Sequence, residues 1–124
     1  MAVAETEPAQ KKQPIPIQED PSPAEKTYLF QALWFRKPHG AARFREYLEV
    51  ASPIAAEYGG RRVEGLLPLE TLRGDFEPDY IFVVEWPSLN RYYEFLKDLH
   101  YQSVARLREE AVAKAVILNC RRLV

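Results

Sequence analysis

Segments with the pattern of a β-strand and segments with the pattern of a helix alternate along this chain. Residues 28–35 (YLFQALWF) are rich in aromatic residues and have the length of a strand. Apolar residues then recur at steps of three and four between Phe44 and Tyr58, as on the buried side of an amphipathic helix that ends at Gly59-Gly60. Pro53 lies inside this pattern, so we expect either a kink or a second short helix that Ser52 caps.

The middle of the chain predicts a hairpin. Residues 61–72 have a weaker strand pattern, in which Gly65 and Pro68 favour a bulge or an edge position. Residues 74–78 (GDFEP) are typical of a turn, and the apolar run of residues 79–86 follows as the next strand. We therefore expect these two strands to be antiparallel neighbours.

Helical patterns and a last strand complete the chain. Ser88 is in the position of an N-cap, and the helix after it has a buried side made of Leu89, Tyr92, Leu96 and Leu99. A short helix over residues 101–112 and an apolar strand over residues 115–123 follow. The complete order is strand, helix, strand, strand, helical region, strand.

This order predicts an α+β fold of the ferredoxin-like, split βαβ type. In that fold four antiparallel strands lie in the spatial order four, one, three, two, and the helices cover one face of the sheet. Both alternating sets of side chains are largely apolar in residues 28–35 and 79–86, so neither face is patterned for contact with water. A second copy of the chain would cover the free face, and we expect a homodimer with a barrel-like centre, a dimeric α+β barrel.

Composition separates residues 1–26 from the domain that we predict over residues 27–124. Residues 1–26 contain five of the ten prolines, eight charged residues and no aromatic residue. Such a segment cannot bury enough apolar surface to offset the entropy of ordering, so we expect a disordered Pro-rich tail. The tail is either an arm that docks its Pro-Ile-Pro-Ile stretch on a partner or a solubilising leader.

Charge and cysteine content exclude several classes of function. With 17 basic and 18 acidic residues the net charge is -1, which gives no global field for nucleic acid or anionic lipid. Cys120 is the one cysteine, so there is no internal disulfide and no Cys-rich metal site. We expect no signal peptide and no membrane-spanning segment, and a cytoplasmic location.

Five short stretches resemble a known family. They are Tyr58-Gly59-Gly60-Arg61, the turn Gly74-Asp75-Phe76-Glu77-Pro78-Asp79, Val84-Glu85-Trp86-Pro87-Ser88, and His100-Tyr101-Gln102 with Leu107-Arg108. Over residues 28–124 the chain resembles the family catalogued as domain of unknown function 1330, of the dimeric α+β barrel superfamily. The resemblance implies the fold and the dimer. Cofactor-free monooxygenases, lactone isomerases, polyketide cyclases and haem-binding enzymes belong to the same superfamily, so kinship alone selects no reaction.

Three polar residues interrupt the apolar runs of the strands that we expect to be neighbours: Gln31, Glu85 and Asn119. We expect them to face one cavity. There Glu85 would act as a general acid or base with a raised pKa, while the two amides orient a carbonyl or hydroxyl group. In the alternative, Glu85 lies at the exposed end of its strand and pairs with an arginine such as Arg61.

The two histidines show no metal-binding spacing, so we expect no metal site. His100 precedes Tyr101, and both are candidate catalytic residues. His39, by contrast, has only fold analogy to support a role as a haem ligand.

The aromatic residues either line a pocket for a flat apolar molecule or form only the hydrophobic core. We expect Trp34, Tyr92 and Arg61 to contact a ligand beside the polar residues above. Two classes of function follow: a cofactor-independent isomerase, cyclase or monooxygenase acting on a small apolar or aromatic molecule, or a non-catalytic dimer that binds a metabolite or a protein.

Overall fold

Strands and helices follow one another in the predicted order in this computed structural model, which describes residues 25–123. The predicted tail, residues 1–26, lies almost wholly outside the described residues. The elements are β1 (Thr27–Phe35), α1 (Gly40–Glu57), β2 (Arg61–Leu66), β3 (Tyr80–Trp86), α2 (Leu89–Lys97), α3 (Leu99–Ala111) and β4 (Val112–Cys120).

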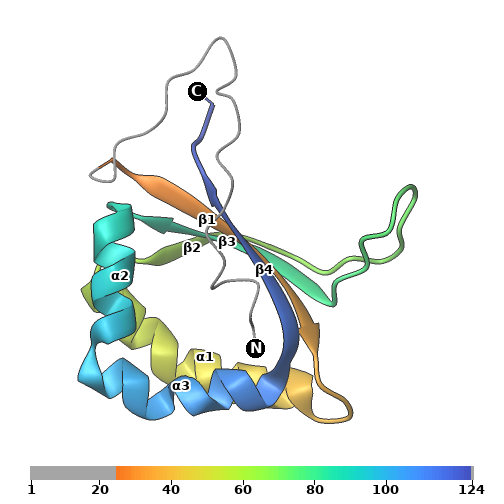
Figure 1. Cartoon of the computed structure of the whole chain (residues 1–124), viewed down its shortest axis with the longest axis horizontal. Coiled ribbons are helices and arrows are strands. Elements are labelled where there is room, and N and C mark those ends of the chain that lie inside the picture. The colour runs from red at the N-terminus through yellow and green to blue at the C-terminus, as the bar shows by residue number, and fades with distance from the viewer. Residues whose placement is uncertain (1–24, 124) are drawn as a thin grey trace.

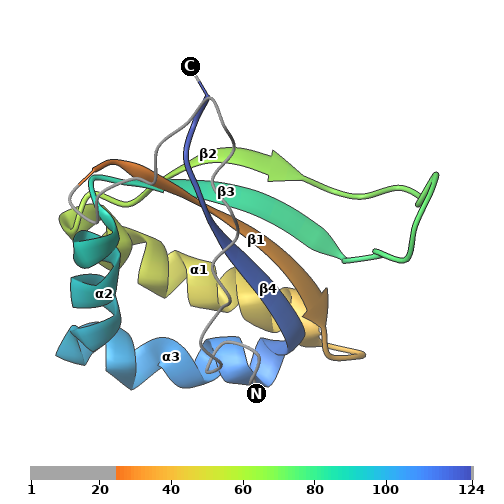
Figure 2. The same cartoon turned by 45° about the horizontal axis from the view of Figure 1, so that its top comes forward.

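One antiparallel sheet in the order β2-β3-β1-β4 forms one layer of the molecule. All three helices lie against the same face of this sheet, and the opposite face carries no helix (Figures 1 and 2). This arrangement confirms the predicted ferredoxin-like α+β fold, including the spatial order of the strands. Within residues 25–123, no helix has the length and hydropathy needed to cross a membrane.

Two strands differ from their predicted limits by three residues or more. β2 ends at Leu66 instead of residue 72, two residues before Pro68, which has no N–H to donate to a ladder. Its pairing with β3 shifts between Arg62 and Glu64, which confirms the predicted irregularity on this edge strand. β4 begins at Val112 instead of residue 115, because α3 ends at Ala111 and the chain enters the sheet without a loop.

α1 is one helix that contains Pro53, so no second helix begins at Ser52. Its end has the bonding of a Schellman motif: the N–H of Gly60 donates to Ala55 O and the N–H of Gly59 donates to Ala56 O. Gly59 has φ +88°, which a side chain would disfavour. The predicted glycine stop of this helix is therefore confirmed.

The two later helices begin at side-chain caps. Ser88 Oγ accepts a hydrogen bond from the N–H of Arg91 (3.1 Å), as the sequence predicts. Asp98 caps α3 by accepting from the N–H of Tyr101 (2.9 Å), so α3 starts at Leu99 rather than at residue 101.

The hydrophobic core lies between the sheet and the helices. One alternating set of strand side chains points toward the helices, and buried residues of α1, α2 and α3 meet it. The buried cluster consists of Leu29, Leu33, Phe44, Tyr47, Ala51, Ile54, Phe82, Trp86, Phe95, Tyr101 and Ala111. Gln31 belongs to the same set of strand positions as Leu29 and Leu33, and it is polar.

The other alternating set forms what we call the open face of the sheet. It includes Phe30, Ile81, Val83, Val116 and Leu118, the last of which is 51% exposed. The segment between β2 and β3, residues 67–79, extends away from the body of the molecule and is called the arm (Figures 1 and 2). Leu69 is 93% exposed and Leu72 is 87% exposed on this arm.

Candidate functional site

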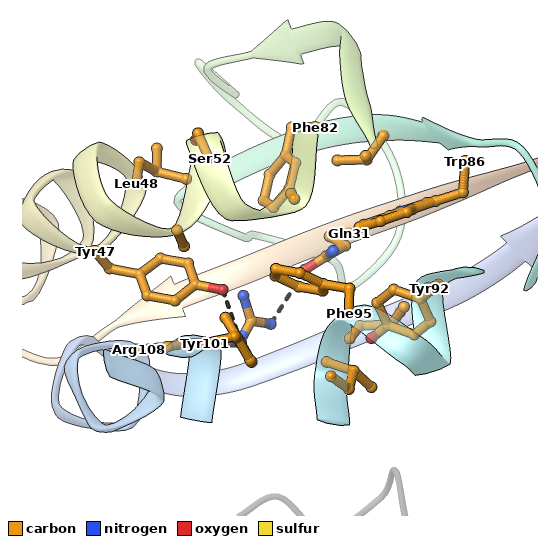
Figure 3. A pocket seen from close by; sticks show the side chains of 15 residues that line it. Gln31, Tyr47, Leu48, Ser52, Phe82, Trp86, Tyr92, Phe95, Tyr101 and Arg108 are labelled. Carbon is orange, nitrogen blue, oxygen red and sulfur yellow. Dashed lines mark hydrogen bonds between the residues drawn. The ribbon is translucent and has the colours of Figure 1, made fainter. Parts of the chain in front are cut away.

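A cavity of about 260 Å³ lies between the sheet and all three helices. Its lining residues come from β1, β3 and β4 on one side and from the inward sides of the helices on the other. They are Gln31, Tyr47, Leu48, Ala51, Ser52, Ala55, Phe82, Val84, Trp86, Tyr92, Phe95, Leu96, Tyr101, Arg108 and Ile117 (Figure 3).

Aromatic rings form one part of the wall. The ring of Trp86 lies 5.3 Å from that of Tyr92 and 5.2 Å from that of Phe95, measured between centroids. Phe95 lies 4.2 Å from Tyr101, which links this wall to the polar part of the cavity. Such rings favour a flat apolar molecule.

The side chains of a polar cluster meet in the cavity: Arg108, Gln31, Tyr47 and Tyr101 (Figure 3). The guanidinium of Arg108 donates to Gln31 Oε1 (3.1 Å). The two tyrosine hydroxyls are hydrogen-bonded to each other at 2.9 Å. The cluster therefore combines one cation with three neutral polar groups.

Burial favours the protonated form of both tyrosines. It raises the pKa of Tyr47, and this effect outweighs the opposing positive charge of Arg108 nearby. Burial also raises the pKa of Tyr101, with a further contribution from Tyr47. At neutral pH both phenols are therefore hydrogen-bond donors.

Helix periodicity explains why the cluster points inward. Tyr101 and Arg108 are seven residues apart on α3, so they share one face of that helix. Tyr47 belongs to the buried face of α1. Gln31 lies opposite Phe82 on β3 and Ile117 on β4, which both line the cavity.

Trp86 is 3% exposed, and its indole N–H has no hydrogen-bond partner within the described part of the chain. Gly60 lies beside this indole, and a Cβ built there would come within 2.7 Å of the ring. The glycine therefore allows the tryptophan to occupy its place in the cavity wall.

Three of the predicted site residues lie in the cavity: Gln31, Tyr92 and Tyr101. They come from β1, α2 and α3, so the fold brings together residues that are distant in sequence.

The expectation that Glu85 shares a cavity with Gln31 is wrong. Glu85 pairs across the sheet with Tyr28 and Arg61, one strand position away from the set that faces the helices, and it therefore lies on the open face. Its carboxylate binds Arg61 at 3.0 Å and Lys26 at 3.7 Å, which is the arrangement of the alternative prediction.

The surroundings of Glu85 also oppose a raised pKa. Burial would raise the pKa of this carboxyl, but hydrogen bonds from Arg61 and Tyr28 and the positive charge of Lys26 outweigh it, so the pKa is lowered. The carboxyl is therefore ionised at neutral pH.

The remaining predicted residues lie outside the cavity. Asn119 is exposed and accepts a hydrogen bond from Thr27 Oγ1. Trp34 is on the open face, where its ring contacts Phe76 of the arm. His100 is exposed in the first turn of α3, and Arg61 is exposed beside Glu85.

Within residues 25–123, no group of three or more His, Cys, Asp or Glu side chains could hold a metal ion. None of the described residues that line the cavity is a carboxylate or a histidine. The polar cluster can therefore bind and stabilise negative charge on oxygen, but it contains no ordinary general base.

Arg108 and Tyr47 were not predicted as site residues. Arg108 carried a signal: it repeats the helical position of Tyr101 on a face that is otherwise apolar. A charged residue on such a face needs a polar partner, and Gln31 on a distant strand supplies it. That pairing depends on the tertiary fold, so sequence periodicity alone could not identify it.

The model of a family described as a domain of unknown function (DUF1330) matches residues 26–119. No curated protein matches the chain significantly.

Solved structures share the fold. RPA0582, a protein of unknown function from Rhodopseudomonas palustris, is 21% identical, with 82% of this chain and 85% of that chain covered and a TM-score of 0.75. A dimeric ferredoxin-like protein of unknown function from Jannaschia sp. CCS1 is 10% identical, with coverage of 78% and 99% and a TM-score of 0.63. SnoaB, a cofactor-independent oxygenase from Streptomyces nogalater, is 14% identical, with coverage of 82% and 98% and a TM-score of 0.56. At these identities the similarity establishes the fold alone.

Proposed function

This chain belongs to the family described as a domain of unknown function (DUF1330), and from that premise we propose that it is a homodimer that binds one small aromatic molecule per protomer, between its sheet and its helices. The observation that carries the proposal is the cavity, with aromatic rings on one side and a polar cluster on the other. Ligand sites are typically apolar pockets with a few placed polar groups, which is the composition of this cavity.

The size of the cavity limits the ligand. Pockets for drug-sized molecules typically have volumes of about 300–1,000 Å³. At about 260 Å³ this cavity is just below that range, so the ligand has a single ring or two fused rings rather than a larger skeleton.

Catalysis is the second candidate function, and the polar cluster is the observation that favours it. Arg108, Tyr47 and Tyr101 are suited to stabilising an oxyanion that develops on a bound molecule, as in cofactor-independent isomerisation, cyclisation or oxygenation. These reactions also need a group that removes a proton, and the described lining residues include no carboxylate or imidazole. Binding is therefore the function that the cavity supports best.

The open face and the arm support the homodimer. The open face carries apolar side chains in a sheet that has helices on one side only, and the arm exposes Leu67, Leu69 and Leu72. A second copy would cover both at once, because the arm extends beyond the edge of its own body. Solved proteins of the same fold from Jannaschia sp. CCS1 and Bacteroides fragilis are described as dimeric.

A cavity-filling substitution tests the proposal. Ala55 lines the cavity, whereas its neighbour Ala56 is exposed on the same helix, so Ala55→Leu and Ala56→Leu form a matched pair. Calorimetric titration with 1-naphthoate and with 1-naphthamide should detect binding of at least one of them to the native protein. Ala55→Leu should weaken that binding about tenfold or more, and Ala56→Leu should leave it unchanged.

The proposal would be rejected if neither naphthalene compound, nor a one-ring aromatic acid or amide, bound the native protein. It would also be rejected if both leucine variants, with unfolding midpoints close to native, bound the compounds as the native protein does.

A further inference from the structure

We infer that the ligand of the cavity is an aromatic carboxylate whose carboxylate group pairs with Arg108; this inference rests on the proposed function. It adds the charge of the ligand to the size and shape that the cavity requires. The argument depends on how the structure surrounds this one cation.

Among the residues that the structure describes, Arg108 has neutral partners only. Its guanidinium donates to the side-chain oxygen Oε1 of Gln31 at 3.1 Å and is also hydrogen-bonded to the hydroxyl of Tyr47. None of the ion pairs found among residues 25–123 includes Arg108. The cation is thus partly buried, and no carboxylate of the described part of the chain pairs with it.

Other arginines of the same region are paired differently. Arg106 on α3 and Arg43 on α1 both contact the carboxylate of Glu110, at 3.4 Å and 4.0 Å. This ion pairing lies on the exposed side of the helices. α3 itself therefore carries acidic side chains, and the fold directs Glu110 away from the cavity.

A partly desolvated guanidinium without a counter-ion favours an anionic ligand. Removing a charge from water is unfavourable unless it is paired and hydrogen-bonded, and neutral partners compensate for only part of this loss. Arginine has five N–H donors in a planar fork that matches a carboxylate in a bidentate way. A carboxylate in the cavity would supply the missing charge and accept donors that Gln31 and Tyr47 leave over.

The two tyrosines add a further donor. Their hydroxyls bond to each other, which uses the hydrogen of one of them and leaves the hydrogen of the other for an acceptor. Both phenols stay protonated at neutral pH, so they attract an anionic oxygen and do not repel it.

Three matched pairs of compounds test the inference: benzoate with benzamide, cinnamate with cinnamamide, and 1-naphthoate with 1-naphthamide. In each pair the shape is nearly constant and the charge differs. Calorimetric titration of the native protein at neutral pH should give at least one acid that binds about tenfold or more tightly than its amide.

Arg108→Gln should remove this preference, so that acid and amide bind within about twofold of each other, because the acid loses its charged partner. Arg108→Lys, which keeps the charge but lacks the planar fork, should retain part of the preference. Arg106→Gln is the matched control, because it removes the same charge from the exposed side of the same helix and should keep the full preference.

The outcomes separate the inference from the function on which it rests. Equal binding of acids and amides to the native protein would overturn the inference and leave the aromatic-binding function in place. An acid preference that survives in folded Arg108→Gln would also overturn it. If none of the six compounds bound the native protein, the proposed function would fail and the inference with it.

Discussion

Asp98 joins two helices through a single carboxylate. One oxygen accepts the hydroxyl hydrogen of Tyr58, at the end of α1, at 2.6 Å, and the other accepts the N–H of Tyr101 in α3 at 2.9 Å. The hydrogen bond from Tyr58 is the largest cause that lowers the pKa of Asp98, followed by the backbone N–H of Tyr101. The charge of this cap therefore fixes the helix that carries both Tyr101 and Arg108.

A pH dependence follows from that lowered pKa. Because the pKa of Asp98 in the folded protein lies below its ordinary value of 3.8, the carboxylate adds stability that is fully present above pH 3.8 and is lost as the pH falls through the folded pKa. Asp98→Asn keeps a capping side chain but removes the charge, so it should be less stable than the native protein at pH 7. Urea unfolding from pH 7 to pH 2.5 should show this difference shrinking below pH 3.8.

Glu46→Gln, at an exposed position of α1 away from the arm and the open face, is the control for a change in net charge, and at pH 7 its stability should stay close to native. A constant difference between the native protein and Asp98→Asn down to pH 2.5 would contradict the role of the charge.

In our proposal, two copies of the chain associate through the arm and β4. Leu118 of β4 lies opposite Phe30 on the open face, and Leu69 and Leu72 are almost fully exposed on the arm. Apolar side chains in such positions are typical of surfaces that a partner covers. The open face is thus the element through which we expect two copies to meet.

Leu118→Asp should shift the protein from dimer to monomer, because a carboxylate buried in an apolar interface without a partner opposes association by several kcal/mol, on the order of 3–5. Light scattering coupled to size-exclusion chromatography measures this shift. Leu99→Asp, at an exposed leucine in the first turn of α3 and away from the open face, should remain dimeric. A native protein that is monomeric at micromolar concentration, or a dimeric Leu118→Asp variant, would contradict this use of the open face.

Local patterns in the sequence predicted most of the elements correctly. The repeat from Phe44 to Tyr58, the Gly59-Gly60 stop and the Ser88 cap are all features of neighbouring residues, and the structure has each of them. The start of α3 was missed because Leu99 continues the apolar pattern of the preceding helix, although Asp98 ends that helix and caps the next by accepting from the N–H of Tyr101.

The site was predicted only in part, for a similar reason. Gln31 is visible as a polar residue in an apolar strand, and its partner Arg108 is visible as a charge on a buried helix face. Deciding which polar strand residues share a face needs the register between strands, and a difference of one position sends a side chain to the opposite face. This is why Glu85, expected beside Gln31, lies on the open face.

At the scale of the whole molecule, the sheet divides two tasks between its two faces. The face toward the helices carries the cavity with Gln31 and Trp86, and the open face carries Trp34 and Leu118. In our account the first face binds a ligand and the second binds another copy. The two tryptophans therefore report on the two faces separately.

The most direct test of the account is a nitrogen–proton NMR spectrum of the indole N–H signals during titration with 1-naphthoate. The chain has two tryptophans, so the folded protein gives one signal for each, and Trp34→Phe assigns them. The account predicts that the signal of Trp86, in the cavity wall, shifts in a saturable way while the signal of Trp34 stays in place. A shift of Trp34 alone, or of neither signal, would contradict it.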